Sequence, residues 1–352
     1  MRLEIQLNRP DLARRYAAAY LRLDPTDVNA PWIRLAALLL DPNRSHTPEA
    51  ARMIDGASAP VLFGAGLWHL GWWADSDETG VRVARAIIRR SGTGVDPWTD
   101  TLMFPQYLAL MLGFRGHLHA AYAADRRLLL DPSGSRFGEF LDPFFTLSLV
   151  GVIPESLAEK TYGRALDPAK AWPMPPWSVT ARQLRGLPWW LARRDTASLA
   201  RFARRAEQEA RSQPTARGKL QGRYLHAAAT AYLALARTDS VRALNLFQAI
   251  PDTLCIANDC YYEKLTESRL LTAQGQARQA GALLDRWIWG AGGPLHVIAA
   301  VEQGRIAEGL GERRKARDSY QFVLDAWRHA DPELEPYVRE ARAGLQRLAV
   351  RR

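Results

Sequence analysis

Cysteine is scarce in this chain, which carries only Cys255 and Cys260. Two cysteines are too few for a fold held together by disulfides. On a helix, residues five apart lie about 140° from each other around the axis, and this separation suits neither a metal clip nor a redox pair. We therefore expect two reduced thiols.

Sequence motifs of common enzymes are missing too. The chain contains no Gly-x-Ser-x-Gly elbow, no phosphate-binding loop and neither of the kinase motifs Asp-Phe-Gly and His-Arg-Asp. The best metal candidate, His117-x-His119, lies in a helical pattern, where residues two apart diverge by about 200°. The sequence thus predicts no enzyme activity, no catalytic residue, no bound metal and no cofactor.

No secretory signal is evident, because MRLEIQLNRPDLARR at the N-terminus lacks an apolar core. We expect a cytoplasmic protein, or an extracytoplasmic one if the chain is part of a larger membrane-anchored polypeptide. One stretch without charged residues, Gly56 to Ala74, has a membrane-like length. Its four glycines, proline and histidine favour a buried helix over a membrane span.

Basic residues outnumber acidic ones, 47 to 37, and the net charge is +10. The excess is spread along the chain in pairs such as Arg89-Arg90 and Arg204-Arg205, with no basic run interleaved with stacking aromatics. Pairs of this kind are typical of the solvated outsides of helices. Nucleic-acid binding through the basic surface is therefore kept as the second functional hypothesis.

Three segments of the C-terminal half align without gaps. They are LHAAATAYLALARTDSVRALNLF (225–247), YYEKLTESRLLTAQGQARQAGALL (261–284) and VIAAVEQGRIAEGLGERRKARDSY (297–320). Four columns match, each stepping by 37 and then 36 residues: small residues at Ala231, Ser268 and Gly304; turn residues at Thr238, Gly275 and Gly311; small residues at Ala243, Ala280 and Ala316; large residues at Phe247, Leu284 and Tyr320.

These columns describe a helical hairpin. The two small positions lie on either side of the turn, where two antiparallel helices approach closely. A left-handed residue ends the first helix, and the large residue packs toward the next hairpin. Because no hairpin can bury its face alone, the units are expected to stack.

The N-terminal half carries the same period in its prolines. Steps of 35, 37, 35 and 36 residues separate Pro25, Pro60, Pro97, Pro132 and Pro168. Four of them follow an Asp that can cap the next helix. We predict an all-α, right-handed superhelical solenoid of about nine helix pairs. Its sub-arrays are 1–168, with an incomplete first hairpin, and 169–352, with a capping helix over 336–349.

The period, the small packing residues and the proline joints resemble a degenerate tetratricopeptide repeat. The closing block EQGRIAEGLGERRKARDSYQFVLDAWRHADPELEPYVREARAGLQRL (302–348) is similar to the end of the repeat regions of bacterial serine/threonine protein kinases and related regulators. The kinase domain itself is absent from this chain. The resemblance implies a non-catalytic scaffold that senses or recruits a protein or peptide, or a fragment of a larger kinase-type regulator. The oligomeric state stays open.

In that repeat family the inner face of each first helix lines the binding groove. Carried over to this chain, the face predicts partner-binding residues at Tyr232, Tyr262, Arg269, Thr272, Arg305 and Glu308. Arg269 and Arg305 fall in one column and could hold a carboxylate-bearing peptide by bidentate hydrogen bonds. Alternatively, each arginine pairs with a neighbouring acid such as Glu267 or Glu308.

Two further sequence features, the tryptophan groups and one charged stretch, each allow two interpretations. The tryptophan groups at Trp68 to Trp73, Trp189-Trp190 and Trp287-x-Trp289 fit hairpin core or the wall of an apolar pocket. The stretch DAWRHADPELEP (325–336) has the residue density of an active site. It is better interpreted as a joint in which Trp327 ends one helix and Asp331 caps the next.

Overall fold

The computed structural model describes residues 10–39, 41, 47–58, 61–62, 86, 109, 112–123, 147–164, 186–250, 260–286 and 293–350. The chain divides into two compact units, each assembled from separate stretches of sequence. Unit 1 comprises residues 1–143, 288–298 and 322–338, and unit 2 comprises residues 144–287, 299–321 and 339–352. The predicted boundary at 168/169 lies outside the described residues.

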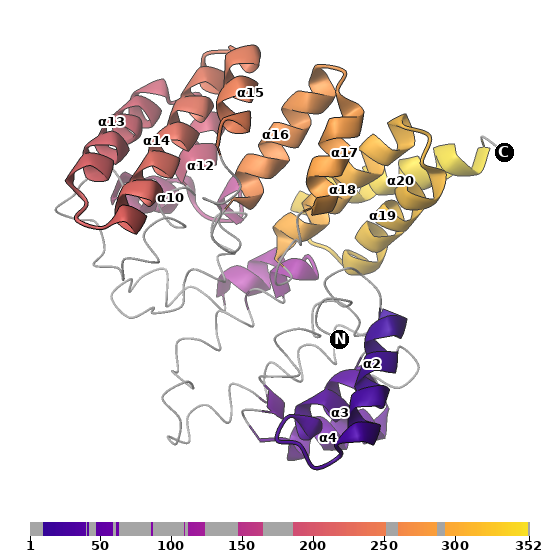
Figure 1. The fold of residues 1–352 in the computed structure, drawn as a ribbon. Helices are drawn as coiled ribbons and strands as arrows, with labels where there is room; N and C mark the ends of the chain where they lie inside the picture. The colour runs from indigo at the N-terminus through magenta and orange to yellow at the C-terminus, as the bar shows by residue number, and fades with distance from the viewer. Residues whose placement is uncertain are drawn as a thin grey trace. The chain divides into compact units, whose positions relative to one another are not determined.

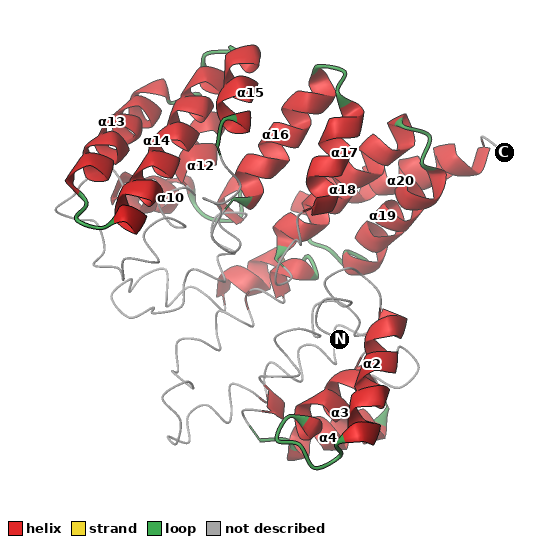
Figure 2. Cartoon of the chain, in the orientation of Figure 1, coloured by secondary structure: helices red, strands yellow, loops and turns green. Residues whose placement is uncertain are grey.

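Every regular element in these described ranges is a helix (Figure 2). The predicted all-α class is thereby confirmed for this part of the chain. The α-helices, labelled in Figure 1, are α2 (Pro10–Leu23), α3 (Ala30–Leu39), α4 (Pro48–Gly56), α10 (Glu155–Arg164), α12 (Gly186–Ala192), α13 (Thr196–Ser212), α14 (Ala216–Ala236), α15 (Ser240–Gln248), α16 (Tyr261–Ala273), α17 (Ala277–Arg286), α18 (Pro294–Gly309), α19 (Arg313–Ala326) and α20 (Glu335–Val350). The 3₁₀ helix η2 (Pro332–Leu334) precedes α20.

One kind of turn recurs at the ends of several helices. Six turns among the described residues have a left-handed residue at their centre: Gly116, Gly151, Arg194, Thr238, Gly275 and Gly311. In each, the next residue's N–H donates to a carbonyl five residues back, at 2.8 to 3.0 Å. This is the Schellman pattern that ends a helix and reverses the chain.

The aligned turn column is confirmed, because all three of its members, Thr238, Gly275 and Gly311, have positive φ. The turns at Gly116, Gly151 and Arg194 were not predicted individually. A non-glycine residue rarely adopts this backbone. Sequence inspection for glycine alone therefore misses Arg194.

Small residues mark the close approaches, as predicted. Within the α16 and α17 hairpin, the Ser268 hydroxyl donates to the carbonyl oxygen of Ala280 at 3.3 Å. A Cβ atom added to Gly304 on α18 would lie only 2.5 Å from the Tyr320 ring on α19. The helices can come this close because the side chains at these positions are small.

The first proline joint that the structure describes is confirmed as a break between helices. α2 ends at Leu23, and α3 begins only at Ala30. Asp24 caps a turn rather than a helix, because its carboxylate accepts from the backbone N–H of Thr26 at 3.1 Å. Pro60, Pro97, Pro132 and Pro168 lie outside the described residues.

The expectation of two reduced thiols is wrong, because Cys260 is disulfide-bonded. Cys255, the other cysteine of the chain, lies outside the described residues. The helical angle used in the prediction does not apply, because Cys260 precedes α16 as its N-cap residue. A residue at that position has non-helical backbone and can turn toward a nearby loop.

None of the described helices has both the length and the apolar content required to cross a membrane. Most of the stretch from Gly56 to Ala74, with its tryptophans, lies outside the described residues, as do Trp287 and Trp289. Trp189 and Trp190 are buried. Their rings contact Tyr162 and Phe202, with centroid separations of 5.4 and 5.7 Å, so this pair belongs to the core.

Candidate functional site

The predicted groove residue Tyr232 is buried. Its ring meets Phe247 edge to face at 5.2 Å between centroids, and its hydroxyl donates to Glu263 at 3.2 Å. Burial, followed by the charge of Glu263, raises the pKa of Tyr232 well above its usual value. The placement of Tyr232 on an open groove is therefore wrong, because α14 packs against α12, α13 and α15.

The other predicted residues lie on the first helices of two successive hairpins. On α16, Arg269 and Thr272 are exposed and Tyr262 is half-buried. On α18, Arg305 is exposed and Glu308 is half-buried. The accessible part of the predicted groove is thus the C-terminal ends of α16 and α18.

Arg269 is held by one bond that leaves most of its guanidinium group open. Its Nε donates to Oε1 of Glu302, on α18, at 2.5 Å. Among the described residues, Nη1 and Nη2 of Arg269 make no hydrogen bond. The bond to Glu302 orients the guanidinium plane, and its outer edge keeps four N–H donors for a ligand.

Arg305 differs, because all three nitrogens of its guanidinium group donate hydrogen bonds. Its Nη1 donates to the same Glu302 oxygen at 2.9 Å, while Nε and Nη2 form a bidentate pair with Glu340 on α20. The hydrogen bonds to Glu340 raise the pKa of Arg305 further above its ordinary value. Arg305 is therefore a clamp between helices, and the predicted two-arginine fork for one carboxylate is reduced to Arg269.

A third arginine of the same kind was missed by the sequence reasoning. Arg347 on α20 donates from Nε and Nη2 to the two carboxylate oxygens of Glu308 on α18, at 2.7 and 2.8 Å. The Tyr320 hydroxyl donates to the same carboxylate at 3.0 Å. Glu308 is therefore a structural acceptor in this structure, with its oxygens already occupied.

The alternative hypothesis, that Arg269 and Arg305 each pair with an acid, is confirmed, but the acids differ from the examples Glu267 and Glu308. The acids are Glu302 and Glu340. Glu267 instead accepts from Lys264 at 3.1 Å, and both of these side chains are buried. Such a pair within one helix contributes to the core rather than to a binding face.

The side chains of the three arginines are more exposed to solvent than those of the glutamates with which they pair. The side chains of Arg269, Arg305 and Arg347 are 46, 42 and 46% exposed, whereas those of Glu302, Glu308 and Glu340 are 9, 14 and 26% exposed. Solvent therefore meets guanidinium groups that rest on covered carboxylates. We call Arg269, Arg305 and Arg347 the arginine row.

The joint at 325–336, in unit 1, contacts a segment from the first half of the chain. Trp327 is buried, and its indole N–H donates to the carbonyl oxygen of Phe114 at 2.9 Å. The backbone N–H of Asp331 donates to the carbonyl oxygen of Gly116 at 2.9 Å. Trp327 therefore joins the end of α19 to residues near Phe114.

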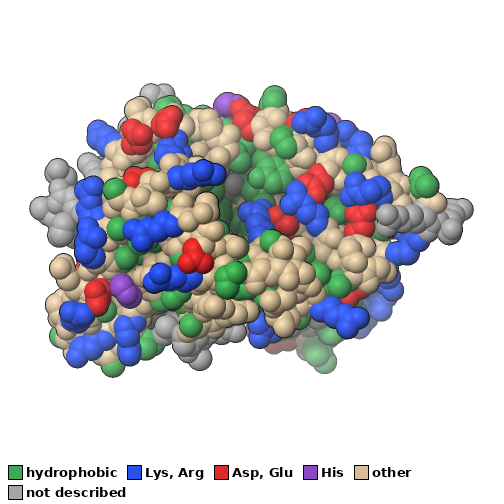
Figure 3. Space-filling view, turned by 90° about the horizontal axis from the view of Figure 1, so that it is seen from above, with side chains coloured by type: hydrophobic (Ala, Val, Ile, Leu, Met, Phe, Trp, Pro, Cys, Tyr) green, Lys and Arg blue, Asp and Glu red, His purple; other side chains and the backbone are tan. Residues whose placement is uncertain are grey.

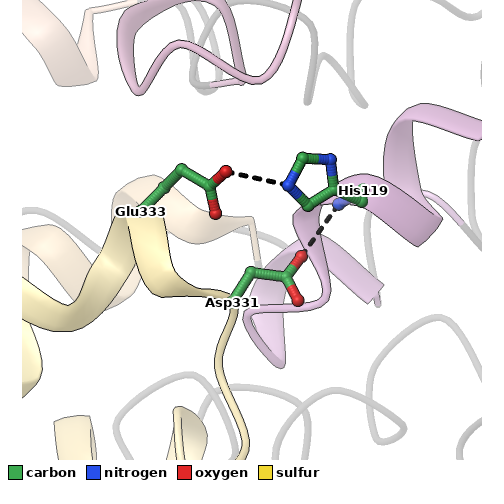
Figure 4. Close-up of side chains that lie close together, drawn as sticks. All are labelled: His119, Asp331 and Glu333. Atoms are coloured by element: carbon green, nitrogen blue, oxygen red, sulfur yellow. Dashed lines mark hydrogen bonds and ion pairs between the residues drawn. The ribbon is translucent and has the colours of Figure 1, made fainter.

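Asp331 caps a different helix from the one predicted. It precedes η2, but its side chain makes no capping bond there. Instead its Oδ2 accepts from the backbone N–H of His119 at 2.9 Å, at the start of the helical residues 118–123 (Figure 4). The reason is local, because the equivalent position of that turn is His117, whereas Asp195 and Asp239 cap the helices after two other turns.

Glu333 completes a cluster with these two residues. Its Oε1 lies 2.8 Å from Nε2 of His119 (Figure 4). A hydrogen bond from its own backbone N–H, together with His119, lowers the pKa of Glu333. His119, Asp331 and Glu333 each offer a ligand atom within 4.8 Å of the others, whereas His117 is not part of this group.

Comparison with protein-family models, with curated proteins and with solved structures gives no match to the chain. The geometry of the described residues is therefore the basis for any functional assignment.

Proposed function

We propose that this chain is a non-catalytic helical-repeat scaffold, of the degenerate tetratricopeptide kind, that binds a protein or peptide partner. Successive hairpins with identical turns support this proposal, because stacked hairpins present their first helices side by side. In this proposal the chain is the sensing or recruiting part of a bacterial signalling system.

The arginine row is the observation that carries the proposal. Arginine on a rigid helix, seated on a covered carboxylate, is an ordered donor that loses little conformational freedom on binding. Arg269 supplies the open donors, and Thr272 one turn later is also exposed. A partner with acidic side chains suits this end of α16 best.

Charge placement favours a protein partner over nucleic acid. On the face drawn in Figure 3, Lys and Arg side chains are spread among acidic and apolar ones. A nucleic-acid surface would need a continuous basic track that follows the phosphates. The arginine row is a group of three arginines, each already paired with a glutamate, and is not such a track.

Peptides selected from a random display library on the immobilised full-length chain test the proposal. We expect fluorescence anisotropy to show about tenfold weaker binding to Arg269→Ala, which loses charge-assisted hydrogen bonds. Arg278→Ala is the matched control, because Arg278 is exposed on α17 and makes no ion pair in the described part of the chain. It should bind like the parent protein.

Salt dependence separates this function from the nucleic-acid alternative. Peptide binding should fall modestly between low and physiological salt, whereas phosphate-driven binding falls steeply. Failure to select any peptide, together with steeply salt-dependent retention of duplex DNA, would show that the scaffold proposal is wrong.

A further inference from the structure

We propose that His119, Asp331 and Glu333 form a binding site for one divalent transition-metal ion of the zinc type. The three residues come from two segments of unit 1 and converge at one point (Figure 4). His119 Nε2 and oxygens of the two carboxylates lie within 4.8 Å of one another. The ligand atoms around one tetrahedral zinc ion lie about 3.3 Å apart, because each lies about 2 Å from the metal, so the three side chains would move closer together on binding.

Within the described residues, one carboxylate oxygen of Glu333 and one of Asp331 accept no hydrogen bond and are available as metal ligands. Glu333 Oε2 is shielded from solvent and has no hydrogen-bond partner. Asp331 uses Oδ2 for the cap of His119, and its Oδ1 accepts no hydrogen bond within the described residues. A shielded carboxylate oxygen without a donor is costly, and a cation would remove that cost.

The charge of the cluster also favours a bound cation. The site brings two carboxylates together, and within the described residues the His119 imidazole is the basic group that pairs with Glu333. A neutral imidazole donates its Nε2 lone pair to a metal, and the metal's charge offsets both acids. Coordination would replace the present hydrogen bond between His119 and Glu333.

The donor set determines the class of metal. One imidazole nitrogen with two carboxylate oxygens suits Zn²⁺, Co²⁺ and Ni²⁺, whereas Mg²⁺ and Ca²⁺ prefer oxygen ligands alone. The His119 side chain is 62% exposed, so its ring can adjust and an ion can enter from solvent. Water completes the coordination, as in other sites with three protein ligands.

A bound ion would cross-link residues 112–123 to the joint after α19. Asp331 and His119 already connect these segments through the cap. The metal site is independent of the proposed function, because the arginine row belongs to unit 2. Failure of one therefore leaves the other untouched.

Untagged, full-length protein that has been stripped with EDTA and dialysed tests the proposal. We expect calorimetric titration to show one Zn²⁺ per chain, and Co²⁺ to give the visible absorption of a low-coordinate protein site. His119→Ala and Glu333→Gln should each weaken Zn²⁺ binding at least about tenfold. His329→Ala is the control, because His329 is an exposed histidine outside the cluster.

Zn²⁺ should also raise the melting temperature of the parent protein, because an ion that binds only the folded state stabilises it. Glu333→Gln in EDTA should melt close to the parent protein and show that the variant is folded. No saturable binding at millimolar Zn²⁺ would overturn the proposal. Unchanged affinity in folded His119→Ala would also overturn it.

Discussion

Asp331 and His119 are 212 residues apart in the chain, yet a carboxylate oxygen of Asp331 lies 2.9 Å from the backbone nitrogen of His119. The same bond within a hairpin is made by Asp195 to Ser198 and by Asp239 to Arg242, at 2.9 and 3.0 Å. An N-cap that is local elsewhere is thus supplied from a distant joint here. The cap couples the helical residues 118–123 to the C-terminal joint.

Asp331→Ala should lower the free energy of unfolding by about 1 kcal/mol, as loss of an N-cap does. Asp331→Asn keeps an oxygen acceptor and should lose much less. Urea unfolding in the presence of EDTA measures both, and hydrogen exchange should show that protection is lost first at residues 118–123. Equal losses in the Ala and Asn variants would show that the cap is not the source of the effect.

The local features of the fold were predictable from the sequence. The turn residues Thr238, Gly275 and Gly311 and the small residues Ser268 and Gly304 act through neighbours within one hairpin. The spacing of such residues in the sequence therefore predicts which residues of a hairpin are in contact. Hairpin geometry could be predicted because it depends on short-range packing.

The site was less predictable, because its partners depend on side-chain choice and on long-range docking. Arg305 bonds at the same time to Glu302, one turn earlier, and to Glu340 on another helix, and the sequence does not show which acids its side chain reaches. The groove predicted from the repeat family included Tyr232 because the alignment of the repeats takes no account of how many helices pack around α14. No sequence signal joins His119 to Asp331, because their contact depends on where two distant segments meet.

Gly304 allows α18 to approach the Tyr320 ring, and Gly304→Ala should therefore be destabilising. The added methyl carbon would lie 2.5 Å from the ring, so we expect a loss of about 1 to 3 kcal/mol from overpacking. Gly309→Ala on the same helix is the control, because nothing lies within 4 Å of its added Cβ. It should be neutral or stabilising, and equal losses in the two variants would exclude a packing effect.

Thr238 adopts a left-handed backbone with φ of 64°, which is strained for a β-branched residue. Thr238→Gly should relieve this strain and stabilise the protein by about 1 kcal/mol. Gly275→Ala, at the equivalent turn with φ of 78° and no neighbour within 4 Å of the added Cβ, should have the opposite sign. Thermal unfolding of both variants measures these effects, and the Thr238 variant also loses the hydroxyl's hydrogen bond to the carbonyl oxygen of Arg237 at 2.6 Å.

The disulfide at Cys260 predicts the thiol content of the protein. After denaturation without a reductant, thiol titration should find no free thiol, and after reduction it should find the two cysteines of the chain. Stable disulfides are typical of oxidising compartments. Two free thiols in protein purified under air would instead support the original expectation of reduced cysteines.

Alkaline pH should weaken the fold through Tyr320. Burial, followed by the hydrogen bond to Glu308, raises the pKa of the Tyr320 hydroxyl above its ordinary value of 10.0. The folded protein thus keeps the phenol neutral at pH values where the unfolded chain has ionised it. The stabilising contribution is complete below about pH 10 and is lost as the pH rises toward the folded-state pKa.

Tyr320→Phe isolates this titration. The variant loses the hydrogen bond to Glu308 at every pH, which lowers stability by a constant amount of about 1 kcal/mol. Above pH 10 the parent protein should lose stability faster than the variant, so the difference between them should shrink. Tyr16→Phe is the control for removing a tyrosine hydroxyl elsewhere in the chain, because Tyr16 is 51% exposed on α2. Chemical unfolding from pH 8 to pH 11 measures both differences, and a constant gap for Tyr320→Phe would contradict the linkage to this tyrosine.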